Sequence, residues 1–123
     1  MGRLQASRTL PLVLAALLLG ACNMGSDVSR QLGARCQDHD ECDGLCLQGA
    51  MYPDGFCSIN CGEDSDCPGA SRCADIEQGV CLFSCREPAD CEFLGAGWSC
   101  TQLTGRPDGA AVMVCAGAGG GGM

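Results

Sequence analysis

Hydrophobic residues are distributed very unevenly along this chain. The longest apolar run, from Leu10 to Gly20, lies close to the N-terminus and follows two arginines, Arg3 and Arg8. After it, apolar residues come only in short groups between polar loops, and no segment repeats them at the 3.6-residue spacing of a helix. The pattern therefore predicts one apolar segment at the N-terminus and short extended runs everywhere else.

The apolar run has the length of a secretory signal peptide. Signal peptides combine a positively charged start with about 7–15 apolar residues, whereas a helix that spans a membrane needs about 20. We therefore expect residues 1–21 to direct export and to be removed, and not to remain as a transmembrane anchor.

Turn sequences between the short extended runs predict β-hairpins. The clearest case is the turn Pro107-Asp108-Gly109, which has the runs WSCTQLT before it and AAVMVC after it. Proline fixes φ at the second position of such a turn, and glycine accepts positive φ. Similar signals occur at Pro53-Asp54-Gly55 and at Gln78-Gly79. Three hairpins are predicted, with little or no helix outside the signal peptide.

Cysteine spacing divides the same region into three repeats of four cysteines. We call them module 1 (residues 36–57), module 2 (61–81) and module 3 (85–115), joined by the three-residue segments 58–60 and 82–84. Such a density of cysteine in a short chain is typical of a disulfide scaffold outside the reducing cytosol. We expect twelve cysteines to form disulfides: Cys36, Cys42, Cys46, Cys57, Cys61, Cys67, Cys73, Cys81, Cys85, Cys91, Cys100 and Cys115.

Four cysteines in a module allow three pairings. Each module opens with an acidic C-x5-C loop before its hairpin. We favour first-to-third and second-to-fourth, because this pairing ties the loop to both strands, whereas first-to-second with third-to-fourth leaves loop and hairpin unconnected.

The thirteenth cysteine, Cys22, directly follows the apolar run in Leu19-Gly20-Ala21-Cys22. This sequence resembles the bacterial lipobox, and the resemblance implies cleavage before Cys22 and lipidation of its thiol. Residues 22–35 would then be the lipidated cysteine and a flexible tether, and the glycine-rich residues 116–123 a disordered tail. Lipidation also leaves an even number of cysteines for pairing.

The loops have a wider resemblance. CGEDSDCPGASRC resembles segments of Dickkopf N-terminal and whey-acidic-protein cysteine-rich modules, although the chain lacks the adjacent Cys-Cys pair and the eight cysteines of the latter. A lipobox followed by C-x5-C repeats is similar to the cysteine-rich lipoproteins of GC-rich Gram-negative bacteria. These resemblances imply a partner-binding module in the cell envelope, and Asn23 after the lipidated cysteine implies the outer membrane.

Charge narrows the list of partners. Removal of Arg3 and Arg8 with the signal peptide changes the formal net charge from −8 to −10. A chain this acidic is not expected to bind nucleic acid through its phosphates or to dock on anionic lipid headgroups. We therefore expect membrane attachment through the lipid on Cys22.

Candidate chemistry is sparse. The acidic loops offer oxygen ligands for calcium, but short acidic loops more often use their carboxylates to accept backbone N–H bonds. No cysteines have the C-x2-C spacing of zinc or redox sites, and no nucleophile has a recognisable base beside it. We expect no catalytic residue, cofactor or metal.

The sequence thus predicts a lipid-anchored extracytoplasmic protein with a non-enzymatic binding or surface-architecture role. The alternatives are a protease-inhibitor-like module and a calcium-stabilised adhesion module. Module 3 has the longest loops, and the candidate contacts for an unknown protein or surface partner are Phe93, Leu94 and Trp98. Trp98 has a second interpretation, as the small core of module 3.

Overall fold

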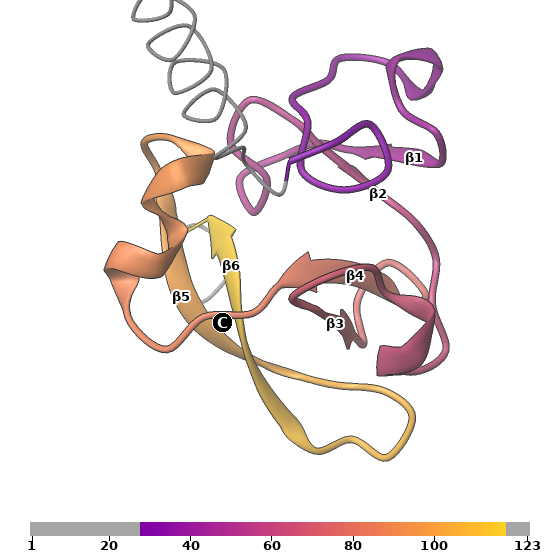
Figure 1. The fold of residues 1–123 in the computed structure, drawn as a ribbon, viewed down its shortest axis with the longest axis vertical. Helices are drawn as coiled ribbons and strands as arrows, with labels where there is room; N and C mark the ends of the chain where they lie inside the picture. Colours follow the sequence, from indigo (N-terminus) through magenta and orange to yellow (C-terminus); the bar gives the residue numbers. More distant parts are fainter. Residues whose placement is uncertain (1–27, 118–123) are drawn as a thin grey trace, which may run out of the picture.

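A computed structural model of the chain describes residues 28–117. The three modules share one plan, in which a short 3-10 helix (η) in the acidic loop is followed by a two-stranded antiparallel hairpin (Figure 1). The fold is therefore the small disulfide-rich one predicted from the sequence, with three separate hairpins. In chain order the elements are η2 (His39–Glu41), β1 (Leu45–Leu47), β2 (Phe56–Ser58), η3 (Asp64–Asp66), β3 (Ser71–Ala74), β4 (Val80–Phe83), η4 (Pro88–Leu94), β5 (Trp98–Thr104) and β6 (Ala111–Gly117).

Two disulfides close each module, and all six follow the first-to-third and second-to-fourth pairing. They are Cys36–Cys46, Cys42–Cys57, Cys61–Cys73, Cys67–Cys81, Cys85–Cys100 and Cys91–Cys115. The third and fourth cysteines of a module lie directly opposite each other in the hairpin register. Residues at opposite positions have side chains on the same face, so both disulfides bind the acidic loop to one face of the hairpin.

The joints between modules are strands and bridges, not free linkers. The first joint runs beside β4, with the Cys81 N–H donating to the Ile59 carbonyl and Asn60 bridging to Val80. The second joint continues β4, and Ser84 bridges to Val114 of β6. Ser58 is fully buried, and its hydroxyl donates to the Cys81 carbonyl at 2.7 Å. Modules 1 and 2 are therefore fixed to each other by backbone contacts.

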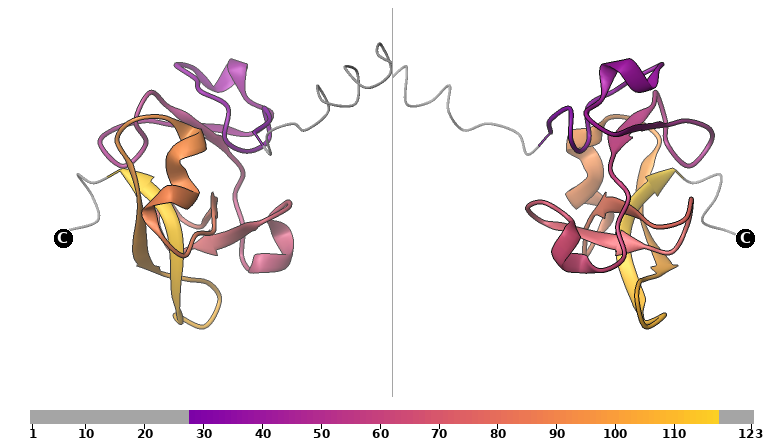
Figure 2. Two further views of the ribbon diagram at one scale, coloured as in Figure 1. Left: turned by 60° about the vertical axis from the view of Figure 1, so that its left-hand side comes forward. Right: turned by 90° about the vertical axis from the view of Figure 1, so that its right-hand side faces the viewer.

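One hydrophobic core is shared by all three modules. β6 packs on β3 and β4, and β2 packs on β4, so that the hairpins converge on the centre of the molecule (Figure 2). Phe56 of module 1 is fully buried, with its ring 6.0 Å from Phe83 and 5.2 Å from Trp98. The disulfides of module 1 form a second, smaller cluster with Ala34. The modules thus share a core that none of them completes alone.

Residues 28–35 are part of this body, which corrects the prediction of a flexible tether up to Arg35. Leu32 is 2% exposed, and the backbone of this segment exchanges hydrogen bonds with Cys57 on β2. A single leucine in a polar segment gives no periodic pattern, but its side chain belongs to the main hydrophobic core. At the other end, β6 extends to Gly117, so the strand includes Ala116 and Gly117, which we predicted to be tail. The signal segment and Cys22 lie outside the described residues.

Candidate functional site

The acidic loops use their last carboxylate, just before the second cysteine, to bind the backbone at the start of the loop. The Glu41 carboxylate accepts N–H bonds from Gln37 at 2.6 Å and from Asp38 at 3.1 Å. Asp66 in module 2 does the same for Gly62 and Glu63, and Asp90 in module 3 for Arg86 and Glu87. These N–H groups precede or begin a 3-10 helix and have no partner within it. The repeated acidic residue before the second cysteine is therefore a structural cap.

Hydrogen bonding to the charged form makes a carboxylate more acidic. The N–H groups of Gln37 and Asp38 lower the pKa of Glu41, and the positive charge of Arg30 lowers it further. These contacts make the carboxylate hold its proton weakly, although its side chain is exposed to water.

A second loop position joins the acidic loop to the hairpin. The third residue after the first cysteine is His39 in module 1 and Asp64 in module 2. The His39 Nδ1 accepts the N–H of Cys46 at 2.9 Å, and the Asp64 carboxylate accepts the N–H of Cys73, also at 2.9 Å. Module 3 has Pro88 at this position. The imidazole of His39 is therefore an acceptor for the backbone, a role that its sequence context gives no sign of.

These contacts reduce the number of free oxygens that the loops could offer to calcium. In each module the carboxylate just before the second cysteine is occupied by two N–H groups. The cysteine sulfurs are no better placed to bind a metal. Within residues 28–117, the sets of three sulfurs that lie within 4.8 Å of one another all consist of disulfide sulfurs. A disulfide offers no thiolate to a metal.

A shallow cavity lies between modules 1 and 2. It has a volume of about 340 Å³. Its lining is mostly polar, from β1 and from the loop before β4: His39, Leu45, Cys46, Leu47, Gln48, Tyr52, Asn60, Glu77 and Gln78. The Tyr52 side chain forms part of the wall, and its hydroxyl is buried without a hydrogen-bond partner. Burial, together with the negative charge of Glu77, raises the pKa of Tyr52 to about 12.

The three predicted partner contacts of module 3 have different surroundings. Leu94 is 7% exposed and belongs to the core. Trp98 is half-buried and packs on Phe56, as expected if it serves as core. Phe93 is 48% exposed, and one edge of its ring packs on Phe83 at 5.1 Å between centroids. Of the three, only Phe93 presents a large apolar surface to solvent.

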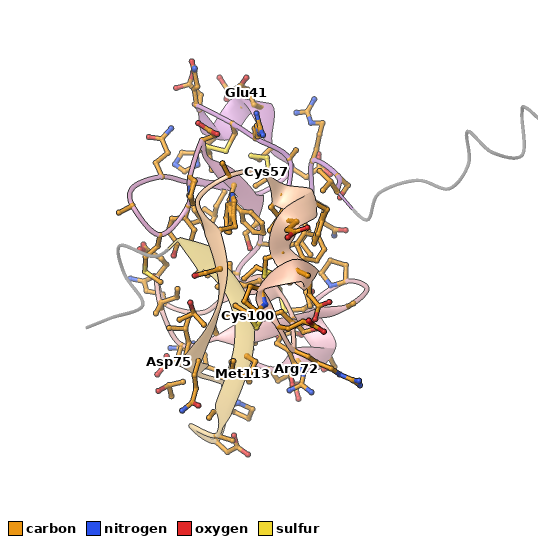
Figure 3. The ribbon with its side chains drawn as sticks, turned by 90° about the vertical axis from the view of Figure 1, so that its left-hand side faces the viewer. Glu41, Cys57, Arg72, Asp75, Cys100 and Met113 are labelled. Carbon is orange, nitrogen blue, oxygen red and sulfur yellow. A yellow bond between two sulfur atoms is a disulfide. The ribbon has the colours of Figure 1, made fainter. Side chains whose placement is uncertain are left out.

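Ion pairs lie at the surface of the body. Arg106, in the loop of the β5–β6 hairpin, contacts Asp75 of module 2 at 2.7 Å and donates to the Gln78 carbonyl. Asp75 and Met113 both lie in the half of the molecule away from Glu41 (Figure 3). The Arg106 contacts fix the hairpin loop of module 3 to module 2.

Comparison with known proteins finds no family model, no curated protein and no solved structure that matches this chain. Residues 28–117 contain no helix long and apolar enough to cross a membrane. The findings together define a small extracytoplasmic type of protein, held by six disulfides in three modules.

Proposed function

We propose that this protein is a lipid-anchored component of the bacterial cell envelope, with a non-enzymatic binding or surface-architecture role. The observation that carries the proposal is the complete pairing of the twelve cysteines between Cys36 and Cys115 within their own modules. None of these cysteines is left to pair with Cys22. This pairing leaves Cys22 without a disulfide partner among residues 28–117, which supports its lipidation as the lipobox-like sequence implies.

The disulfides support the location outside the cytoplasm. Disulfides persist in oxidising compartments, and small exported proteins use them where the core is small. A lipid anchor also agrees with the acidic charge of the chain, because a body with a formal charge of −10 after removal of Arg3 and Arg8 is not attracted to anionic headgroups.

The polar groups of the body support a binding or architectural role in place of catalysis. His39, the chain's one histidine, accepts a backbone N–H bond. Glu41, Asp66 and Asp90 cap loops. No contact within residues 28–117 favours the inhibitor or calcium alternatives over a plain binding role. The partner would be recognised by the outer surface of the modules.

The test is the intact mass of the protein extracted from native membranes. We expect a chain that begins at Cys22 and carries a diacylglyceryl group, with no alkylatable thiol before reduction and twelve afterwards. The Cys22→Ser variant is the control, and it should keep its signal segment and gain no lipid. An unlipidated mature chain with a thirteenth free or intermolecular thiol would overturn the proposal.

A further inference from the structure

One exposed aromatic side chain lies where the chain enters the folded body. Phe93 packs on Phe83, and Phe83 lies against Gly33 so closely that a Cβ on Gly33 would be 2.7 Å from its ring. The same Cβ would be 3.3 Å from Val28, the first described residue. Val28, Phe83 and Phe93 therefore form one continuous apolar cluster. We call its outer part, made of Val28 and Phe93, the entry surface.

Arg35 borders this surface. A Cβ on Gly95, directly after η4, would lie 2.7 Å from the Arg35 guanidinium. Arg30, five residues earlier, lies with the acidic loop of module 1, where it pairs with Asp43 at 3.8 Å. Arg35 therefore places one positive charge beside the end of η4, close to Phe93, in a chain with 15 acidic and 7 basic residues.

The distance from Cys22 to the body is short. Residues 28–35 are packed on β2, so only residues 23–27 separate Cys22 from Val28. Six Cα–Cα steps span at most roughly 20 Å. The lipid attachment point therefore cannot be further than this from the entry surface.

The body is too large for the chain to pass around it. A compact fold of this length has a radius of gyration of roughly 12 Å, hence a diameter of about 30 Å and a path of about 50 Å around half its perimeter. A connection of at most about 20 Å covers less than half of that path. The opposite side of the molecule thus cannot face the bilayer while Cys22 is lipidated.

We propose that the entry surface rests on the membrane, with Phe93 inserted at the lipid headgroups and Arg35 beside it. The proposal depends on the lipidation of Cys22 proposed above. An aromatic side chain enters the headgroup and acyl boundary favourably, and arginine remains at the headgroups. The lipid anchors the protein, and Phe93 sets its orientation, so that the β5–β6 hairpin loop points away from the bilayer.

Two tryptophan probes on lipidated protein test this proposal. The chain has one tryptophan, Trp98, so the probes are made in a Trp98→Phe background. The test probe is Phe93→Trp, and the matched control is Met113→Trp, because Met113 on β6 is 41% exposed and lies outside the entry surface, beside Arg72 and Ser84 of module 2 and the second joint. Each protein, with lipidation at Cys22 verified by mass, is placed in phosphatidylcholine vesicles that contain brominated acyl chains.

We expect bromine to quench the Phe93→Trp probe at least about twofold more strongly than the Met113→Trp probe. Equal quenching of both probes, or quenching of neither, overturns the proposed orientation while leaving lipidation intact. A protein that carries no lipid fails at the mass measurement, and this outcome counts against the proposed function instead.

Amide hydrogen exchange on the unsubstituted lipidated protein gives a second measurement that depends on no variant. Vesicle binding should slow exchange at residues 92–97 and leave residues 105–110, in the β5–β6 loop, unchanged. Slowing at the loop alone would reverse the orientation and contradict the proposal.

Discussion

Single side chains in this protein replace backbone partners that short elements cannot provide. A 3-10 helix of one turn leaves its first N–H groups without acceptors. Glu41, Asp66 and Asp90 accept two such N–H groups each, although their side chains are exposed. The acidic pattern of the loops was open to two interpretations from the sequence, and the structural one is confirmed in all three modules.

Glu41 should make the protein sensitive to acid. Its pKa is lower in the folded chain than in the unfolded chain, so its contribution to stability is complete above pH 4.5 and is lost as the pH falls through the lowered value. Thermal melts of the wild type and of Glu41→Gln should therefore differ at pH 7 and converge toward pH 2.

The control for this experiment is Glu92→Gln. Glu92 is also exposed, but only its backbone carbonyl accepts a hydrogen bond, from Gly95. It should melt like the wild type at both pH values. If the melting temperature of Glu41→Gln lies as far below that of the wild type in acid as at neutral pH, the charge of Glu41 is not what binds the loop.

Tyr52 should be less favourable than phenylalanine at the same position. Its hydroxyl is buried without a partner, and a buried unsatisfied polar group costs about 1–3 kcal/mol. We expect Tyr52→Phe to raise the free energy of unfolding by about 1 kcal/mol, measured by denaturant titration. A loss of stability would show that a bound water satisfies the hydroxyl.

The same residue should respond to alkali. Burial and Glu77 raise the pKa of Tyr52 to about 12, so the folded state favours the protonated phenol. The stability that this preference contributes is fully present below pH 10 and is lost as the pH rises through the higher value. Tyr52 is the only tyrosine, so absorbance at the tyrosinate band follows it directly. Titration near pH 10 in the folded protein would mean that the hydroxyl is solvated.

At the scale of the elements, the sequence predicted the hairpins and the pairing of their cysteines. Regular cysteine spacing and turn residues are local signals, which explains this success. The short 3-10 helices were not foreseen, since η2 and η3 have three residues each and η4 has seven, which is too short to show a clear period. The glycines of the three predicted turns also differ in their surroundings. Gly109 lies in the open hairpin loop, whereas Gly55 and Gly79 touch the backbone of the first cysteine in their modules.

Alanine substitutions of Gly55 and Gly109 separate the cost of a steric clash from the cost of a positive φ. Gly55 has φ of 84° and Gly109 has φ of 81°, so alanine is strained at both. A Cβ on Gly55 would lie 1.9 Å from the Cys36 carbonyl oxygen, but a Cβ on Gly109 would meet nothing within 4 Å. Gly55→Ala should therefore cost at least about 2 kcal/mol more than Gly109→Ala in denaturant unfolding. Equal losses would assign the whole effect to φ.

At the scale of the whole molecule, the sequence left open whether the modules pack together. The contacts that decide the question join residues far apart in the chain, such as Phe56 with Trp98. Leu32 is buried in the core that the modules share, and Ser58 is buried where its hydroxyl reaches Cys81 of module 2. No local pattern contains this information. Phe93 was predicted among the candidate contacts, but its packing against Phe83, ten residues earlier, could not be read from the sequence.

The shared core predicts a single unfolding transition. Phe56 belongs to module 1, while Trp98, the one fluorescent tryptophan, belongs to module 3. Phe56→Ala should destabilise the protein by about 3–5 kcal/mol and lower the midpoint seen by Trp98 fluorescence. Met113→Ala, at an exposed site, should change stability by less than about 0.5 kcal/mol. An unchanged Trp98 midpoint in Phe56→Ala would mean that the modules unfold independently.

The confinement of every disulfide to its own module affects how the chain can mature. The partners are separated by 10 to 24 residues, and no bond crosses a joint. A chain that leaves the translocation pore with its N-terminus first can oxidise Cys42 with Cys57 before Cys61 has emerged. Each module can complete its own oxidation in turn, and an error in one cannot exchange with cysteines that are still inside the pore. The shared core can be completed only once β6 has arrived, because Val112, Val114 and Cys115 of this strand belong to it.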